Sequence, residues 1–184
     1  TDDQGYGDLG LFGSMDIKTP NIDALGNDGA TLTDFLVASS TCSPSRAALL
    51  TGSYPMRTGV VGVLWPEGHG FGGKNGGKVG LHPNEVTISE VLKEKGYATA
   101  MAGKWHLGSK GHYPEDQGFD VNVGGFEKGS PMGGYYSPYK NPKLSDGPED
   151  EYLTDRLTQE TIDFIDSSDH SKPFAAFLSF YNVH

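Results

Sequence analysis

The chain's single cysteine lies in a run of residues that could bind and attack an anion. The run is Cys42-Ser43-Pro44-Ser45-Arg46, in a chain of 184 residues. A proline near its start and a glycine at position 52 predict a helix over 43–50, because proline suits the first turn and glycine the residue after the last. The thiol would lie beside unpaired N–H groups at the positive end of the helix dipole, with Arg46 one turn further on. Such a site can hold a tetrahedral oxyanion next to a nucleophile, although a lone cysteine is more often a small buried apolar side chain.

Further polar groups follow two predicted strands, Tyr97–Ala102 and the near-continuous apolar run Phe174–Val183, which is typical of a strand buried on both faces. Ligands bind open α/β sheets at the carboxyl ends of their strands. The groups at those ends, with the two carboxylates that open the chain, are Lys104, His106, His184, Asp2 and Asp3. Singly, they fit a solvated turn, an ordinary loop or a satisfied core histidine. Together with the cysteine and the helix start, they indicate one catalytic edge if the strands are parallel neighbours.

The elements that must position these groups alternate between helix and strand, which predicts a layered α/β fold. Thr87 and Glu90 form a capping box at the start of the clearest helix. Helices are expected over Asn21–Asn27, Thr87–Lys95 and Glu151–Ser167, and a further strand over Thr31–Val37.

Two segments lack periodicity. Residues 65–80 are rich in glycine, and residues 109–148 are rich in glycine, proline and tyrosine. The whole chain has 27 glycines, roughly double the average usage, which indicates many tight turns. Structureless loops of this length are usually functional or disordered.

Composition excludes several classes of protein. The formal net charge of −10 argues against a surface that tracks nucleic-acid phosphates. No apolar run approaches the length of a membrane span, and one cysteine allows no internal disulfide. The chain begins at Thr1 without a methionine and stops at His184 directly after an apolar run. We interpret it as a piece of a longer gene product, whose targeting segment would lie outside it.

Four stretches resemble the type I, formylglycine-dependent sulfatases of the alkaline-phosphatase superfamily. They are Cys42-Ser43-Pro44-Ser45-Arg46-Ala47-Ala48-Leu49-Leu50-Thr51-Gly52, Gly103-Lys104-Trp105-His106-Leu107-Gly108, Thr1-Asp2-Asp3-Gln4-Gly5-Tyr6-Gly7-Asp8 and Thr19-Pro20-Asn21-Ile22-Asp23-Ala24-Leu25. The resemblance implies an α/β fold with a mixed, mostly parallel sheet sandwiched by helices and incomplete at both ends. Residues 1–184 would be the N-terminal portion of a single sulfatase catalytic domain.

The resemblance also implies a modified nucleophile. The cysteine that matches Cys42 is oxidised to formylglycine by a maturation enzyme, which reads the Cys-x-Pro-x-Arg element. One hydroxyl of the hydrated aldehyde attacks the ester sulfur and expels the alcohol. The second hydroxyl then drives the release of sulfate.

Roles carry over by matching position. Asp2 and Asp3, with the side chain derived from Cys42, would bind a divalent cation, Ca²⁺ or alternatively Mg²⁺. Arg46 would hold the formylglycine and metal region in place. Lys104 and His184 would bind the sulfate, His184 with the option of protonating the leaving oxygen, and His106 would contact the hydroxyl that expels sulfate.

The family's further metal ligands and a second sulfate-binding lysine would come from sequence beyond His184. Two aspartates are too few for a tight Ca²⁺ site, which takes six or more oxygens. We therefore expect the isolated chain to bind metal poorly and to turn over little or no sulfate ester.

The substrate is expected to be a sulfated carbohydrate, or otherwise a small sulfate ester. The tyrosines of the stretch 133–142, above all Tyr135 and Tyr136, could pack on sugar rings, or could equally anchor the loop on the core. One rival is a phosphonate or phosphate ester hydrolase of the same superfamily. Another is a non-catalytic protein that binds sulfated glycans. The resemblance further implies export to the periplasm, the outside of the cell or the lysosome.

Overall fold

The computed structural model describes residues 1–65, 69–70, 73–74 and 80–184. Most of the predicted glycine-rich segment 65–80 therefore lies outside the described residues. The helices are α1 (Pro20–Asp28), α2 (Cys42–Thr51), α3 (Pro55–Thr58), α4 (Ile88–Glu94) and α5 (Leu153–Ser167), with 3-10 turns η1 (Tyr6–Asp8), η2 (Gly10–Phe12) and η3 (Pro114–Gln117). The strands are β1 (His69–Gly70), β2 (Gly73–Lys74), β3 (Ala98–Gly103), β4 (Val121–Val123) and β5 (Phe174–Ser179).

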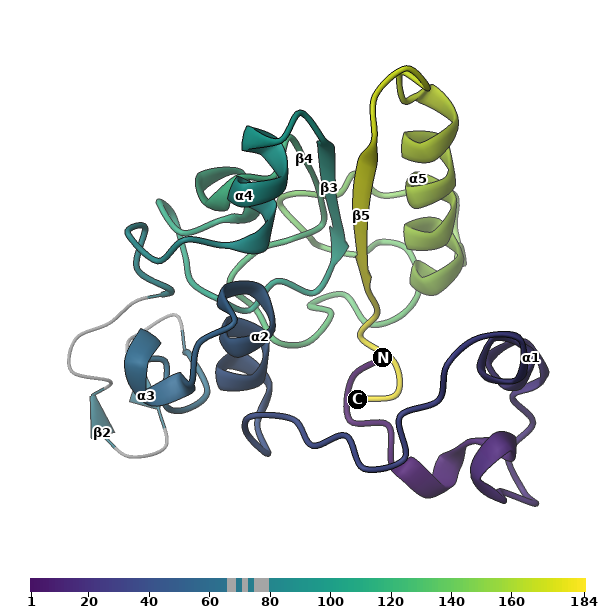
Figure 1. The fold of residues 1–184 in the computed structure, drawn as a ribbon. Helices are drawn as coiled ribbons and strands as arrows, with labels where there is room; N and C mark the ends of the chain where they lie inside the picture. Colours follow the sequence, from purple (N-terminus) through teal and green to yellow (C-terminus); the bar gives the residue numbers. More distant parts are fainter. Residues whose placement is uncertain (66–68, 71–72, 75–79) are drawn as a thin grey trace.

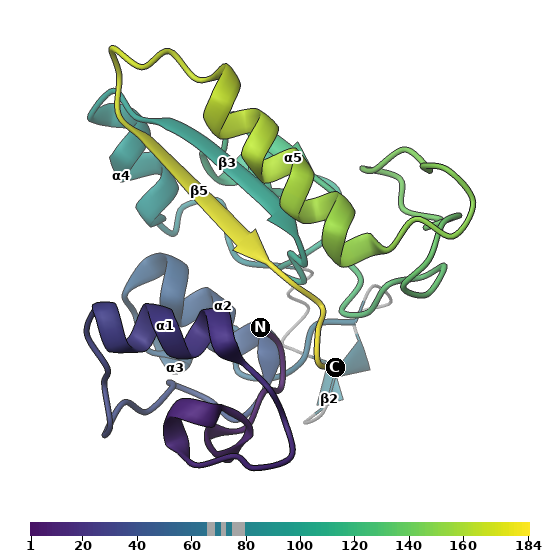
Figure 2. The same ribbon diagram turned by 90° about the vertical axis from the view of Figure 1, so that its right-hand side faces the viewer.

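The main sheet is parallel, with β3 between β4 and β5. Its register pairs Ala98 with Phe174 and Gly103 with Ser179. Helix α4 lies on one side of the strands and α5 on the other (Figures 1 and 2). The short strands β1 and β2 form a separate antiparallel pair. The predicted α/β fold, with a mostly parallel sheet between helices, is confirmed.

Local sequence accounts for the start of α4. The backbone N–H of Glu90 donates to the Thr87 hydroxyl at 3.3 Å, and the Thr87 N–H donates to the Glu90 carboxylate at 2.7 Å. The buried Thr87 hydroxyl also contacts the Gln117 carbonyl at 2.8 Å. The capping box therefore fixes the start of α4, as the sequence predicts, and the Thr87 hydroxyl also attaches α4 to η3.

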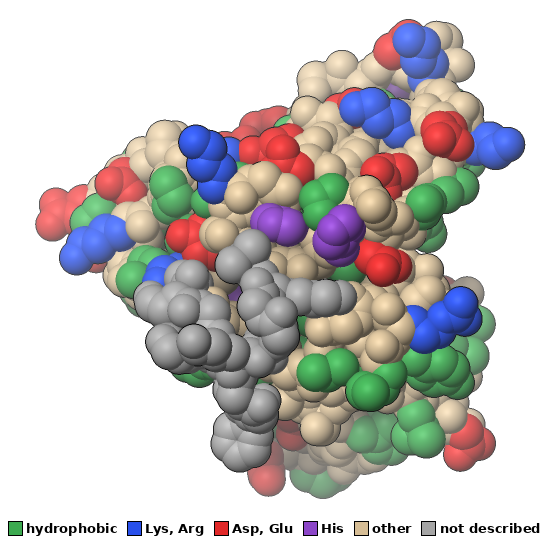
Figure 3. Space-filling model, turned by 90° about the vertical axis from the view of Figure 1, so that its left-hand side faces the viewer, with side chains coloured by type: hydrophobic (Ala, Val, Ile, Leu, Met, Phe, Trp, Pro, Cys, Tyr) green, Lys and Arg blue, Asp and Glu red, His purple; other side chains and the backbone are tan. Residues whose placement is uncertain are grey.

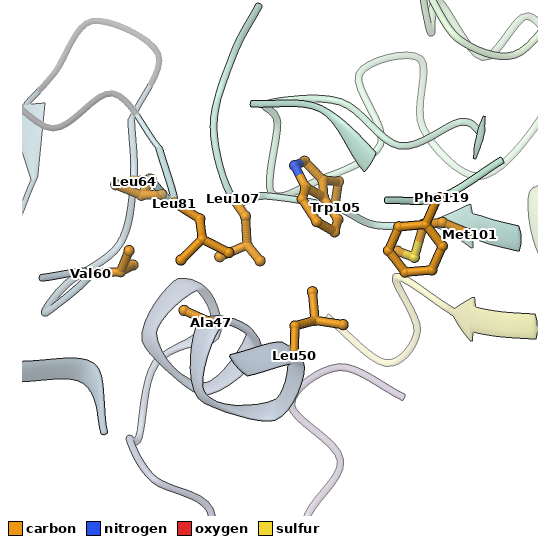
Figure 4. Packing of buried hydrophobic residues seen from close by; sticks show 9 residues of the cluster. All are labelled: Ala47, Leu50, Val60, Leu64, Leu81, Met101, Trp105, Leu107 and Phe119. Carbon is orange, nitrogen blue, oxygen red and sulfur yellow. The ribbon is translucent and has the colours of Figure 1, made fainter. Parts of the chain in front are cut away.

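A buried apolar cluster holds α2 against the turn that follows β3. Ala47 and Leu50 of α2 point toward Leu81, Trp105 and Leu107 (Figure 4). Trp105 and Leu107 are completely buried. Because Trp105 stands between Lys104 and His106, the packing that anchors the tryptophan also fixes the backbone of its two polar neighbours.

Two predicted strands differ in the structure. The residues of Thr31–Val37 form no strand, and the side chains of Phe35 and Leu36 are exposed. Alternating polarity alone does not make a strand, which also needs a hydrogen-bonding neighbour. The strand predicted over Phe174–Val183 ends at Ser179 and is half-buried, because β5 lies at the edge of the described sheet.

The segment 109–148 contains η3 and β4, neither of which the sequence predicts. A strand of three residues is too short for a clear alternation. Side chains stabilise the rest of the segment. The Tyr139 N–H donates to Asp146 at 2.7 Å, and the buried Tyr139 hydroxyl donates to Glu151 at 2.7 Å. No helix in the described ranges combines the length and hydrophobicity that crossing a bilayer requires.

Gly103 ends β3 with a φ of +96°, a conformation that favours glycine. A Cβ at this position would lie 2.1 Å from the Ser179 carbonyl oxygen. We expect Gly103→Ala to lower the stability of the full-length protein by about 3 kcal/mol or more, combining left-handed strain with a backbone clash. Thermal unfolding measures the change. Gly111→Ala is the control, because Gly111 has a φ of +85° and open space around its Cα. Equal losses for the two variants would contradict the expected clash.

Candidate active site

The start of the chain lies beside the segment that follows β5. The N–H of Asp2 donates to the Asn182 carbonyl at 2.6 Å, and the N–H of Val183 donates to the Asp2 carbonyl at 2.7 Å. On the other side, the N–H of Lys104 donates to the Ser179 carbonyl at 2.8 Å. Backbone pairing therefore brings Asp2, the end of β3 and the end of β5 to one edge (Figure 1).

Asp2, Lys104 and His184 are in direct contact at this edge. The completely buried Lys104 ammonium forms an ion pair with Asp2 Oδ2. His184 Nδ1 lies 2.8 Å from the same oxygen and 3.3 Å from Lys104 Nζ. Burial raises the pKa of Asp2, but hydrogen bonds from Lys104 and His184 outweigh it and hold this pKa below its usual value. The Asp2 carboxylate thus stays ionised, and it accepts a hydrogen bond from the protonated Nδ1 of His184.

A possible cation site overlaps this cluster. Asp2, Asp3 and His184 each offer a ligand atom, and these atoms lie within 4.8 Å of one another. Asp3 has a φ of +59°, and its Oδ2 is 3.9 Å from His184 Nδ1. Carboxylate oxygens are the ligands that hard cations such as Ca²⁺ and Mg²⁺ prefer. The donor types fit such an ion, and Asp2 and Asp3 would supply part of the coordination that Ca²⁺ takes.

Cys42 faces His106. The two meet at 3.2 Å between Cys42 Sγ and His106 Nδ1, across 64 residues of sequence. The other ring nitrogen of His106 lies 2.8 Å from the Leu64 carbonyl oxygen. A carbonyl can only accept, so Nε2 carries the proton and Nδ1 presents a lone pair to Cys42. Burial, helped by Lys104 and Arg46, lowers the pKa of His106 to about 4, and the ring is neutral at neutral pH.

Arg46 connects α2 to the turn after β3. Its Nε donates to the Trp105 carbonyl at 2.6 Å, and its Nη2 donates to the Lys104 carbonyl and, at 3.3 Å, to the Ser179 hydroxyl. Burial lowers the pKa of Arg46, and the nearby Asp2 carboxylate opposes this shift. The arginine therefore bonds to the backbone between the two predicted functional residues Lys104 and His106.

The two predicted sugar-binding tyrosines differ in their surroundings. The Tyr135 hydroxyl donates to the His184 carbonyl at 3.0 Å, which places this side chain against the cluster of Asp2, Lys104 and His184. Tyr136 is 56% exposed, and its ring centroid lies 5.4 Å from that of Tyr152. Tyr135 thus serves to hold His184, whereas Tyr136 offers a ring face to solvent.

Asn182 is a structural member of the site that the sequence analysis missed. Its Oδ1 accepts from the Thr154 hydroxyl at 2.6 Å, and its Nδ2 donates to the Tyr152 hydroxyl at 2.8 Å. Its backbone carbonyl accepts from Asp2. Asn182 therefore ties the start of α5 and the start of the chain to the turn before His184. The only sequence signal was its position two residues before that histidine.

Comparison with known proteins identifies the family to which the chain is similar. The sulfatase family model matches residues 1–184. Human arylsulfatase A is 51% identical over 127 residues, which cover 67% of this chain and 23% of that protein. Mouse steryl-sulfatase is 45% identical over 135 residues, covering 67% of this chain and 20% of that protein.

Solved structures show the same fold. Ps i-CgsB, crystallised with k-i-k-neocarrahexaose, has a TM-score of 0.81 at 32% identity, over 100% of this chain and 44% of that one. A protein in complex with its substrate D-glucosamine-2-N,6-O-disulfate has a TM-score of 0.75 at 27% identity, over 100% of this chain and 33% of that one. The phosphonate monoester hydrolase of Agrobacterium radiobacter has a TM-score of 0.65 at 23% identity, over 100% of this chain and 40% of that one, and so shares the fold.

The chain thus spans less than half the length of each of these relatives and structures. The match to the family model extends over residues 1–184, a range that includes the cysteine motif and the polar groups that follow β3 and β5. The chain belongs to the sulfatase family.

Proposed function

We propose that the full-length protein hydrolyses sulfate esters at the site formed by Asp2, Lys104, His184, Cys42 and His106. The observation that carries this proposal is the placement of the Lys104 ammonium and the His184 imidazole on the Asp2 carboxylate, close to a cysteine at a helix start that faces a neutral imidazole. Membership of the sulfatase family supports the same activity.

Residues 1–184 are proposed to be the N-terminal portion of one sulfatase catalytic domain. The coverage of the relatives supports this division, because the chain matches about a fifth of each curated relative. Exposed apolar side chains support it as well, and they gather in the lower half of the face in Figure 3. Side chains at least 65% exposed include Leu32, Phe35, Leu36, Val37, Leu49 and Met56. A complete domain would cover such a surface. We further propose that the protein is exported, as the family resemblance implies.

Two groups are proposed to complete the site. Asp2 and Asp3, with the side chain derived from Cys42, would hold Ca²⁺ or Mg²⁺, which supplies positive charge to a sulfate ester when bound. A maturation enzyme would convert Cys42 to formylglycine, whose hydrated aldehyde supplies the nucleophilic hydroxyl.

The residues of this chain would then divide the work by position. Lys104 is buried and cationic beside Asp2, so it can bind a sulfate oxygen and neutralise charge in a water-poor site. His184 keeps Nδ1–H on Asp2, and when the imidazole is protonated at both nitrogens, its Nε2–H would donate a proton to the leaving oxygen. His106 directs its Nδ1 lone pair at residue 42, where it can accept a hydroxyl proton as sulfate departs. Arg46 holds the backbone between these groups.

The rival activities fit less well. Several phosphonate and phosphate ester hydrolases of the superfamily use threonine or serine at the position of Cys42, so the cysteine favours sulfate esters. A non-catalytic binding protein would be expected to have lost some of the reacting groups. Cys42, Arg46, Lys104, His106 and His184 are all present.

A sulfated carbohydrate is the proposed substrate. Solved structures with neocarrahexaose and with a sulfated glucosamine support this class. In this chain, the exposed Tyr136 ring next to Tyr152 can pack on a sugar ring, and Tyr135 connects that region to His184.

Sulfate release from an aryl sulfate tests the activity. We expect turnover by the full-length protein that has been matured, and a fall in kcat/KM of about 10²–10³ for Lys104→Met, because this variant removes a charge aimed at the developing anion. Lys110→Met is the control, since Lys110 is exposed in the following loop. Faster wild-type turnover of a phenyl phosphonate than of the aryl sulfate would favour the rival hydrolase.

Tyr136→Ala tests the substrate class. We expect kcat/KM for a sulfated carrageenan oligosaccharide to fall about tenfold, which matches the energy of one aromatic contact, while turnover of the aryl sulfate stays within about twofold. Tyr54→Ala serves as the control, because Tyr54 is 75% exposed on a different part of the chain. An equal loss on both substrates would argue against sugar packing at Tyr136.

A further inference from the structure

We infer that Ser43 is a positioning residue for His106. Through Leu64, Ser43 sets the tautomer and the direction of the His106 imidazole. The inference rests on the proposed function, because it assigns His106 Nδ1 the task of accepting a proton at residue 42. Ser43 follows the nucleophile in sequence, and its side chain is completely buried. It does not touch the substrate edge formed by Asp2, Lys104 and His184.

Three hydrogen bonds form a closed ring. The Ser43 hydroxyl donates to the His106 carbonyl at 2.9 Å and accepts from the Leu64 N–H at 3.1 Å. The Leu64 carbonyl in turn accepts from His106 Nε2 at 2.8 Å. The hydroxyl has one proton, which is used on the His106 carbonyl, so its oxygen can only accept from Leu64. The direction of each bond in the ring is therefore determined.

This closed set of three hydrogen bonds determines which nitrogen of the His106 imidazole presents its lone pair to residue 42. With Nε2 protonated toward Leu64, Nδ1 is the unprotonated nitrogen, and it lies 3.2 Å from Cys42 Sγ. If the Leu64 carbonyl moved away, the proton could reside on Nδ1 instead. The imidazole would then present a donor to residue 42 and could not accept a proton from it.

Packing fixes the plane of the His106 imidazole but not its tautomer. A Cβ at Gly129 would lie 2.4 Å from His106 Cε1, so the backbone of Gly129 closes one side of the imidazole. His106 also has a φ of +56°, in the left-handed region that a residue with a side chain seldom adopts. The Ser43–Leu64 bonds support this backbone and select the proton position.

Ser43→Ala in the full-length protein tests the inference. We expect kcat for sulfate release, normalised to the formylglycine content at position 42, to fall about 10- to 100-fold with KM within about twofold. Lys104 and His184 would still hold the sulfate. Imidazole ¹⁵N chemical shifts should report protonated Nε2 in the wild type and a mixture of tautomers in the variant.

Ser89→Ala is the matched control. Ser89 is also completely buried, and its hydroxyl donates to the Gln117 carbonyl at 2.7 Å and not to the His106 carbonyl. It should lose comparable stability without a change in kcat or in the His106 tautomer. An unchanged His106 tautomer in Ser43→Ala would overturn the inference. Absence of sulfate release by the wild type would instead refute the proposed function, and the ¹⁵N shifts would still test Ser43.

Discussion

The ion pair between Lys104 and Asp2 is the contact on which the site depends. Lys104 is completely buried and Asp2 is nearly so, and a buried charge is tolerated only with a well-placed partner. The two residues are 102 positions apart in the sequence, and His184 shares the same carboxylate oxygen. Any rearrangement that separates the start of the chain from β3 would therefore leave an uncompensated charge in the interior. The arrangement of the candidate site residues therefore depends on the pairing of the chain start with the end of the sheet.

Parallel strand pairing makes this contact possible. The register of β3 with β5 places Lys104 beside the end of β5. Backbone hydrogen bonds between Asp2 and residues 182–183 then bring the start of the chain to the same edge. Helix α2 then brings Cys42 to the same edge, held by Arg46 and by the apolar cluster around Trp105. In the proposed function, sheet pairing would thus provide the anion-binding groups, and helix packing would provide the group that attacks.

The sequence predicts the parts of the fold that depend on neighbouring residues. The capping box at Thr87, the glycine after α2 and the polar residues directly after β3 are all local signals, and the helices and the end of β3 follow from them. The end of β5 does not, because β5 ends at Ser179 and not at the predicted Val183. Thr31–Val37 shows the limit of such signals, because its alternating pattern has no neighbouring strand to pair with in the described residues. The half-burial of β5 likewise depends on how many strands flank it.

Within the site, residue types at strand ends indicated Lys104, His106 and His184, but not the contacts that orient them. The Leu64 carbonyl that orients His106 belongs to a loop without a motif, and a sequence pattern does not predict the position of a backbone carbonyl. Asn182 joins three segments through both of its amide atoms and its carbonyl, an arrangement that only the tertiary structure reveals.

Peptide mass spectrometry across position 42 tests whether Cys42 is converted to the formylglycine nucleophile. The full-length protein would be produced together with a formylglycine-generating enzyme, digested, and treated with a hydrazide probe that captures aldehydes. We expect a peptide in which Cys42 is replaced by the aldehyde and is captured by the probe. An unmodified thiol at this position, despite an active maturation enzyme, would contradict the account and favour a protein that binds sulfated glycans without cleaving them.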